Sequence, residues 1–186
     1  NLAAPDRSAI DLAGRLINLG KFFVPAELLR SEGRFDEEAR AQIRAGHTEA
    51  AELLALVAVD PVMVEAFRDT NERWDGGGWP AGKSGDEISL AARVLAVANA
   101  AVAMASPRSY RAALPSDALV NELWESAGEA FDRGVVATLV SLLEAHDLDL
   151  DHLDAGGVIG DRRVGRLGAD QRLDPHVPLK ALRGFK

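Results

Sequence analysis

Cysteine is absent from the sequence, which excludes disulfide bonds and thiolate metal sites. No apolar run approaches the roughly 20 residues that a membrane-spanning helix needs, and no basic segment followed by an apolar one suggests a signal peptide. A surplus of basic residues is also missing. The net charge is −8, which argues against binding nucleic acid through the whole surface. We therefore expect no membrane span and no nucleic-acid partner, with the cytoplasm as the default location.

The residues that are present suffice for one folded domain. The chain has 186 residues, of which 47% are hydrophobic, and this supports a sizeable buried core. Strand signals are poor, because β-branched residues are scattered and strict alternation of apolar and polar residues does not persist. Helix start and stop signals occur almost throughout, so the sequence predicts an all-α fold with six or more helices. The first residue is Asn1 rather than methionine, which indicates a fragment or a processed chain.

Helix boundaries can be placed from capping residues and glycines. Asp60 followed by Pro61 is the strongest start, because the carboxylate caps the first turn and proline suits the first helical position. The predicted helices begin at Ser8, Asp36, His47, Asp60, Ser89, Ser116 and Asp132. The first, second, fourth, fifth and sixth of them are predicted to end at Gly20, at Gly46, near Trp74, near Met104 and at Gly128.

The composition changes near the C-terminal end. Residues 147–154 are acidic, residues 162–172 are rich in glycine and arginine, and two prolines follow that would interrupt a helix. We therefore divide the chain into a helical domain, residues 1–146, and an irregular C-terminal extension, residues 147–186. The extension has scattered apolar residues but no helical periodicity, so we expect it to pack on the core or on a partner.

The most informative stretch is residues 70–80, TNERWDGGGWP, which contains an acid pair, three glycines and a Trp–Pro ending. Glycines at such a place give the backbone freedom and allow close approach of other groups. Further short blocks stand in order along the chain: LINLGK at 16–21, VP at 24–25, His47 with Ala51, Leu53 and Leu54, RVLAVAN at 93–99, RSYR at 108–111 and FD at 131–132.

Taken in this order, the blocks resemble those of the HD-GYP family, a branch of the HD metal-dependent phosphohydrolases. The resemblance covers roughly residues 8–145 and implies an HD-type helical bundle over that range. Family members hydrolyse cyclic di-GMP or related cyclic dinucleotides at a site with two or three metal ions. Such a site needs histidine and carboxylate ligands, and its metals activate a water molecule and neutralise the phosphate.

The match fails at the positions where family members hold their metals. His47 keeps its imidazole, but the other matched positions carry isoleucine, threonine or asparagine. Isoleucine has no donor atom, and neutral asparagine is a poorer ligand for a divalent cation than aspartate. The resemblance therefore implies degenerate ligand positions and no metal cofactor, with His47 interpreted as a partly buried, hydrogen-bonded histidine. The positions concerned are Ile17, Asn18, His47, Thr70, Asn71 and Asn99.

If the cleft that holds the metals in family members binds a nucleotide in this chain, the binding would depend on the basic and aromatic residues of the matched blocks. Basic side chains would meet phosphate, and an aromatic face would stack on a base. Each has a structural alternative: a solvated lysine, an aromatic ring packed in its loop, or arginines that tie a helix end to the glycine loop. The candidate nucleotide-binding residues are Lys21, Trp79, Lys83, Arg108 and Arg111.

We interpret the chain as a catalytically inactive HD-GYP-like signalling module. It would act through a protein partner or as a homodimer, or it would sense a nucleotide such as cyclic di-GMP without cleaving it. Two alternatives stay open. The chain is a residual metal-dependent phosphodiesterase with a remodelled site at His47, or it is a purely structural domain that serves oligomerisation. Metal analysis separates the residual enzyme from the other readings.

Overall fold

The computed structural model describes residues 4–30, 35–57, 59–106 and 112–146. Within these ranges the chain forms α-helices and short 3-10 helices but no β-strand, which confirms the predicted all-α fold. None of the helices in these ranges is both long enough and apolar enough to cross a membrane. The α-helices are α1 (Ala4–Leu16), α2 (Ala26–Arg30), α3 (Glu37–Leu56), α4 (Pro61–Arg68), α5 (Leu90–Ala105), α6 (Ser116–Glu125) and α7 (Arg133–His146). The 3-10 helices are η1 (Leu19–Phe23), η2 (Asp69–Asn71) and η3 (Gly85–Glu87).

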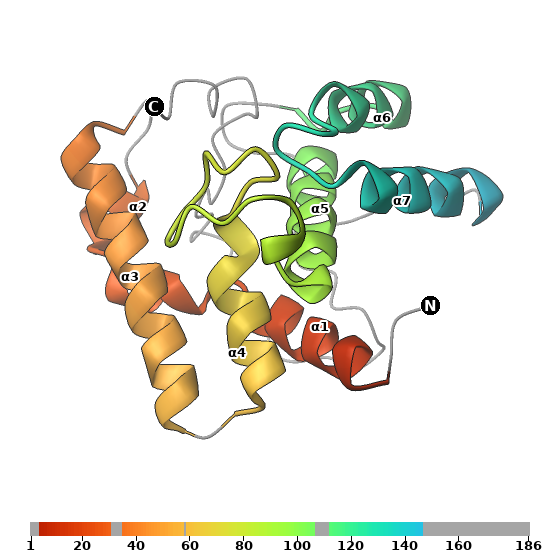
Figure 1. Cartoon of the computed structure of the whole chain (residues 1–186). Coiled ribbons are helices and arrows are strands. Elements are labelled where there is room, and N and C mark those ends of the chain that lie inside the picture. The colour runs from red at the N-terminus through yellow and green to blue at the C-terminus, as the bar shows by residue number, and fades with distance from the viewer. Residues whose placement is uncertain (1–3, 31–34, 58, 107–111, 147–186) are drawn as a thin grey trace, which may run out of the picture.

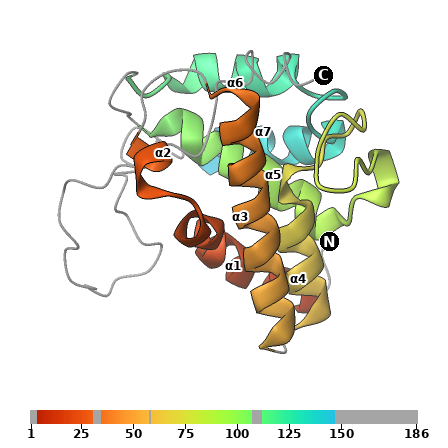
Figure 2. The same ribbon diagram turned by 90° about the vertical axis from the view of Figure 1, so that its left-hand side faces the viewer.

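Helices α3 and α4 form an antiparallel pair that stands side by side in Figure 1 and in Figure 2. Helix α1 packs against α4 and α5, whereas α6 and α7 pack against α5 on the other side of the molecule (Figure 1). Two hydrophobic cores result. Phe67 is fully buried in the first together with Leu95, and Val97 and Leu123 are buried in the second. The alanine-rich α5 contributes to both cores and therefore joins the two halves of the fold.

Most predicted helix starts are confirmed by side-chain caps. The carboxylate of Asp36 accepts a hydrogen bond from the Ala39 backbone N–H at 2.8 Å, and that of Asp60 accepts from Val62 at 2.8 Å. Ser89 Oγ accepts from the Ala92 N–H at 3.3 Å, as expected for a serine cap. Helix α6 begins at Ser116, and the Asp132 carboxylate accepts hydrogen bonds from the backbone of Gly134 and Val135 at the start of α7.

Several predicted boundaries are wrong. Helix α1 already begins at Ala4, so Ser8 lies inside it rather than capping it, and it ends at Leu16 before the predicted Gly20. Helix α4 ends at Arg68, short of the predicted end near Trp74, and α6 ends at Glu125 rather than at Gly128. In each of these two cases a 3-10 turn or a turn follows the helix, so the local signals located the segment but not its last turn.

The largest boundary error concerns Gly46, which was predicted to end one helix before His47 started another. Both residues lie inside the single helix α3. A Cβ added at Gly46 would lie 2.8 Å from the carbonyl oxygen of Gly20 and 2.8 Å from Val24 Cγ2. A Cβ at Gly20 would in turn lie 3.0 Å from the His47 Cα. These two glycines therefore allow η1 to approach the backbone of α3, and Gly46 is needed for packing rather than for helix termination.

Candidate functional site

A pocket of about 230 Å³ lies between η1, α3, α5 and the glycine loop, residues 72–82, which follows η2. All six positions that correspond to metal ligands in the HD-GYP motif line this pocket. Segments far apart in the sequence therefore converge here as the resemblance implied. The six residues are Ile17 and Asn18 before η1, His47 on α3, Thr70 and Asn71 in η2, and Asn99 on α5.

The donor atoms at these positions do not fit a site for two metal ions. Ile17 offers no donor, and Asn18 and Asn99 offer neutral amides where a binuclear site needs carboxylates. The Thr70 hydroxyl donates a hydrogen bond to the Ala66 carbonyl oxygen at 2.8 Å. Among the residues that the structure describes, no three histidine, aspartate or glutamate side chains are grouped so that they could hold a metal ion.

His47 is buried, with 7% of its surface exposed, and its ring contacts two aromatic rings. The ring stacks on Phe67 at a centroid distance of 4.6 Å, and Trp79 meets it edge-on at 5.1 Å. His47 Nε2 lies 3.2 Å from the carbonyl oxygen of Arg68, a group that can only accept, so this nitrogen carries the hydrogen. The Asn71 side-chain nitrogen lies 3.4 Å from the same Nε2. A nitrogen that donates to a carbonyl has no lone pair to offer a metal ion in this arrangement.

Burial lowers the pKa of His47 from its ordinary value of 6.5, and hydrogen bonds to the Arg68 and Phe67 backbone oppose that shift. The unfolded chain therefore binds a proton at a higher pH than the folded one. The free energy of unfolding should fall as the pH drops below about 6.5, through the window between the unfolded and the folded pKa.

We expect a His47→Gln variant to lose this component of the pH dependence, because glutamine does not titrate but can still donate to the Arg68 carbonyl. The measurement is urea unfolding of both proteins at several pH values from about pH 8 to about pH 5. The stability difference between wild type and variant should shrink or reverse toward acid pH. A difference that stays constant over this range would show that His47 is not kept neutral by burial.

The glycine loop, residues 72–82, keeps its shape through close backbone contacts. Gly76 has a φ of +79°, which favours glycine, and a Cβ at Gly78 would collide with the backbone of Arg73 and Glu72. The Asp75 carboxylate accepts two hydrogen bonds from the Arg73 guanidinium, at 3.0 and 2.6 Å. That guanidinium holds the pKa of Asp75 below its usual range. The loop glycines and acids thus serve the loop conformation.

The loop is also fixed to the second half of the fold. The backbone N–H of Trp74 donates to the Ala130 carbonyl at 3.2 Å, and the N–H of Asp75 donates to the Glu129 carbonyl at 2.8 Å. Arg93 on α5 lies over the Trp74 ring, 5.5 Å from its centroid, and donates to the Asp132 carboxylate at 2.8 Å. Arg93 therefore links the loop, α5 and the start of α7.

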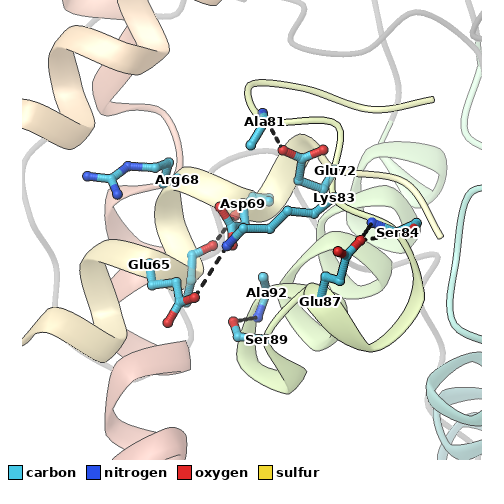
Figure 3. Close-up of polar contacts among 12 residues, drawn as sticks. Glu65, Arg68, Asp69, Glu72, Ala81, Lys83, Ser84, Glu87, Ser89 and Ala92 are labelled. Carbon is cyan, nitrogen blue, oxygen red and sulfur yellow. Dashed lines mark hydrogen bonds and ion pairs between the residues drawn. The ribbon is translucent and has the colours of Figure 1, made fainter. Parts of the chain in front are cut away.

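A buried ion pair connects the end of the loop to the end of α4. Lys83 Nζ lies 2.5 Å from Asp69 Oδ2 and 3.3 Å from Glu65 Oε1, and Figure 3 shows the lysine extended between the two carboxylates. The hydrogen bond to Asp69 raises the pKa of Lys83. Asp69 is 1% exposed, and its Oδ1 has no hydrogen-bond partner among the described residues. Because Asp69 begins η2, this ion pair holds the segment that brings Thr70 and Asn71 to the pocket.

Glu72 is the buried acid of the pocket lining, at 4% exposure. Its Oε1 accepts a hydrogen bond from the Ala81 N–H at 2.6 Å, which Figure 3 shows, whereas its Oε2 has no partner among the described residues. Burial raises the pKa of Glu72, and the nearby Asp69 charge adds to that shift. The Glu72 carboxyl therefore supports the loop backbone through the Ala81 N–H, and burial disfavours its ionised form.

The candidate nucleotide-binding residues are only partly brought together. Lys21 and Trp79 line the pocket, although the Trp79 ring also packs on His47. Lys83 is not among the lining residues and is bound to Asp69 instead. Arg108 and Arg111 lie outside the described residues.

Sequence reasoning missed three arginines of the lining, Arg40, Arg44 and Arg73. Two of them were within reach of a sequence argument. Arg40, Ile43, Arg44 and His47 follow the i, i+3, i+4, i+7 spacing that places residues on one helix face. Once His47 was assigned to the cleft, this spacing could have found Arg40 and Arg44. The erroneous helix break at Gly46 hid it.

Comparison with known proteins identifies the family. The model of the HD domain family matches residues 1–135. The chain is 34% identical over 140 residues to the 3'3'-cGAMP-specific phosphodiesterase 3 of Vibrio cholerae, covering 74% of this chain and 30% of that protein. It is 32% identical over 133 residues to the cyclic di-GMP phosphodiesterase response regulator RpfG of Xanthomonas campestris, covering 70% of this chain and 35% of that protein.

A third relative, the cyclic di-GMP phosphodiesterase of Thermotoga maritima, is 28% identical over 136 residues, covering 72% of this chain and 37% of that protein. The matches thus span only about a third of the length of each of these three relatives. Together with the helical architecture, these matches show that the chain belongs to the HD domain family and is related to the HD-GYP cyclic-dinucleotide phosphodiesterases.

Proposed function

We propose that this domain is a signalling module that binds a ligand or a protein without hydrolysing a cyclic dinucleotide. The observation that carries the proposal is the donor set of the pocket. Six positions that would hold metals converge there, and His47 alone among them has a side chain that favours divalent metals. Its Nε2 faces the Arg68 carbonyl at 3.2 Å, so even this imidazole is engaged within the fold.

The frame around the pocket is kept although the donors differ. The glycine loop is anchored by backbone hydrogen bonds to residues 129–130, and the Lys83–Asp69 pair anchors η2. A frame that positions a pocket supports a role in binding. Cyclic di-GMP is a candidate ligand by relationship, because relatives named for its hydrolysis share this domain.

Contact with a protein is the second way in which such a module would act. Phe22 in η1 is 87% exposed, and Leu56 and Val57 at the end of α3 are 82% and 59% exposed. Exposed apolar side chains at these two places are available for a partner or for a second copy of the chain. A location in the cytoplasm fits such a partner in a signalling pathway and stays part of the proposal.

The proposal is tested by measuring metal content and hydrolysis on the same preparation. The protein is purified without chelators in the presence of iron and manganese, and its metals are measured by plasma mass spectrometry. Cleavage of cyclic di-GMP and of 3'3'-cGAMP is followed by chromatography, with the Thermotoga maritima relative as the positive control. We expect substoichiometric metal and no cleavage that exceeds a protein-free sample.

Three other outcomes would each select an alternative. Two equivalents of metal with cleavage that scales with protein concentration would replace the proposal with a functioning phosphodiesterase. One equivalent that disappears in a His47→Ala variant would indicate a remodelled mononuclear site. A domain that binds neither metal nor ligand and only self-associates would be a structural oligomerisation domain.

A further inference from the structure

We propose that the pocket binds a small organic anion with an apolar body and a single acidic group, rather than a whole cyclic dinucleotide. The acidic group would be held by Arg40 and Arg44 on α3, and the apolar body would lie among the hydrophobic lining residues. This inference deepens the proposed function, since it names the class of ligand for a pocket that does not hydrolyse. It rests on three features: the paired arginines, the apolar walls and the size of the pocket.

The paired arginines form one cationic wall. Arg40 and Arg44 lie one helical turn apart on the face of α3 that also carries Ile43 and His47. Two guanidinium groups at this spacing converge on one acidic group, and guanidinium is the cation best suited to paired hydrogen bonds with a carboxylate or phosphate. Their side chains are 28% and 32% exposed, so both are accessible from the solvent as well as from the pocket.

The arginine pair already holds a carboxylate, that of Glu37, which is not itself among the lining residues. Glu37, in the first turn of α3, accepts a hydrogen bond from Arg44 and lies 3.5 Å from Arg40. The Arg44 hydrogen bond holds the pKa of Glu37 below its usual range. The Glu37 side chain is 71% exposed, so little prevents a ligand acid from displacing it. Glu37 thus shows that both guanidinium groups can meet one carboxylate, and it would compete with a ligand acid for them.

The remaining walls are mainly apolar. Rings and aliphatic side chains come from both halves of the fold and face the same space. An apolar ligand body would therefore exchange water for hydrocarbon along most of its surface, which is the usual character of a small-molecule pocket. The larger apolar lining residues are Ile17, Val24, Leu29, Phe35, Ile43 and Phe131, together with the Trp79 ring.

The size of the pocket favours a ligand smaller than a whole cyclic dinucleotide. Pockets that enclose drug-sized ligands measure about 300–1,000 Å³, and this one measures about 230 Å³. A cyclic dinucleotide carries two bases, two sugars and two phosphates, and its second phosphate would need a second cationic group placed away from Arg40 and Arg44. The other cations of the lining are Lys21, a single ammonium group, and Arg73, whose guanidinium is held by the Asp75 carboxylate through two hydrogen bonds.

The test uses 1-naphthoate as the probe, with the neutral 1-naphthamide as its matched control and cyclic di-GMP as the competing hypothesis. Binding is measured by titration calorimetry on the wild-type chain. We expect 1-naphthoate to bind about tenfold more tightly than the amide, since guanidinium groups form stronger hydrogen bonds with a carboxylate than with a neutral amide and solvent exposure weakens that advantage. Cyclic di-GMP should bind no more tightly than 1-naphthoate.

Three variants assign the binding to the proposed residues. Arg40→Gln combined with Arg44→Gln should weaken 1-naphthoate binding by about tenfold. Glu37→Gln should strengthen it, because the competing carboxylate is gone. Arg15→Gln is the matched control and should change nothing, since Arg15 also pairs with a carboxylate of its own helix, that of Asp11, but is not among the lining residues. Thermal melting of each variant separates lost binding from lost structure.

The inference fails if cyclic di-GMP binds more tightly than 1-naphthoate, or if the arginine and Glu37 variants leave 1-naphthoate binding unchanged. Equal binding of the acid and the amide would likewise overturn it. Failure of the proposed function has a different signature, namely hydrolysis in the assay described above. Cleavage together with arginine-dependent naphthoate binding would reject the first proposal and retain the second.

Discussion

A Lys83→Met variant should lose about 3 kcal/mol of unfolding free energy, because it leaves the Asp69 carboxylate buried without its cation. Removing one partner of a buried ion pair typically costs about 3–5 kcal/mol. Lys83 is 29% exposed, so water would partly replace it, and this favours the lower end of the range. For a domain of this size the loss corresponds to roughly 2–4 °C in melting temperature per kcal/mol. Denaturant unfolding at neutral pH measures the loss directly.

Two further variants separate the buried pair from the exposed one. Glu65→Gln removes the other carboxylate of the cluster, whose side chain is 49% exposed, and should cost less than about 1 kcal/mol. Asp69→Asn in the Lys83→Met background should recover a large part of the loss, because the uncompensated charge is then gone. If Lys83→Met costs no more than Glu65→Gln, the Lys83–Asp69 pair does not stabilise the fold.

The features that sequence analysis predicted correctly are those with a local cause. Asp36, Asp60 and Ser89 cap helices through contacts two or three residues along the chain, so the sequence around each start contains the whole interaction. The residues matched to the family's ligand positions also line one pocket, while their role stays a prediction. Placing these residues together needed only the order of the motif blocks in the sequence, without any knowledge of how the helices pack.

The features that were missed depend on contacts between distant segments. Gly46 has the identity of a helix stop, but its actual constraint is the Gly20 carbonyl on η1, which no local signal reveals. Lys83 was a candidate for phosphate contact, yet it lies against Asp69, fourteen residues earlier in the chain. The predicted helix break at Gly46 also separated His47 from Arg40 and Arg44, so the sequence analysis did not recognise that these residues share one face of α3. Nucleotide binding, which the sequence analysis named as one possible role, stays a prediction.

Alanine substitutions at two helical glycines, Gly14 and Gly46, should change the melting temperature in opposite directions. Replacing a glycine inside a helix by alanine ordinarily stabilises it by about 0.8–1 kcal/mol. Gly14, inside α1, should follow this rule, because a Cβ there would lie 3.6 Å from Leu95 Cδ1, an ordinary contact. Gly14→Ala should therefore raise the melting temperature.

Gly46→Ala should lower the melting temperature, although the helix propensity gain is the same. Its Cβ would lie 2.8 Å from the Gly20 carbonyl oxygen, which is backbone and cannot rotate away as a side chain would. Overpacking costs about 1–3 kcal/mol and occasionally more, so the clash exceeds the propensity gain and the net loss should be about 1–2 kcal/mol. Relief of the clash requires η1 to move off α3, and η1 carries Lys21 into the pocket wall. Thermal melting of both variants under identical conditions decides the matter, and a stabilised Gly46→Ala would show that η1 does not pack this closely on α3.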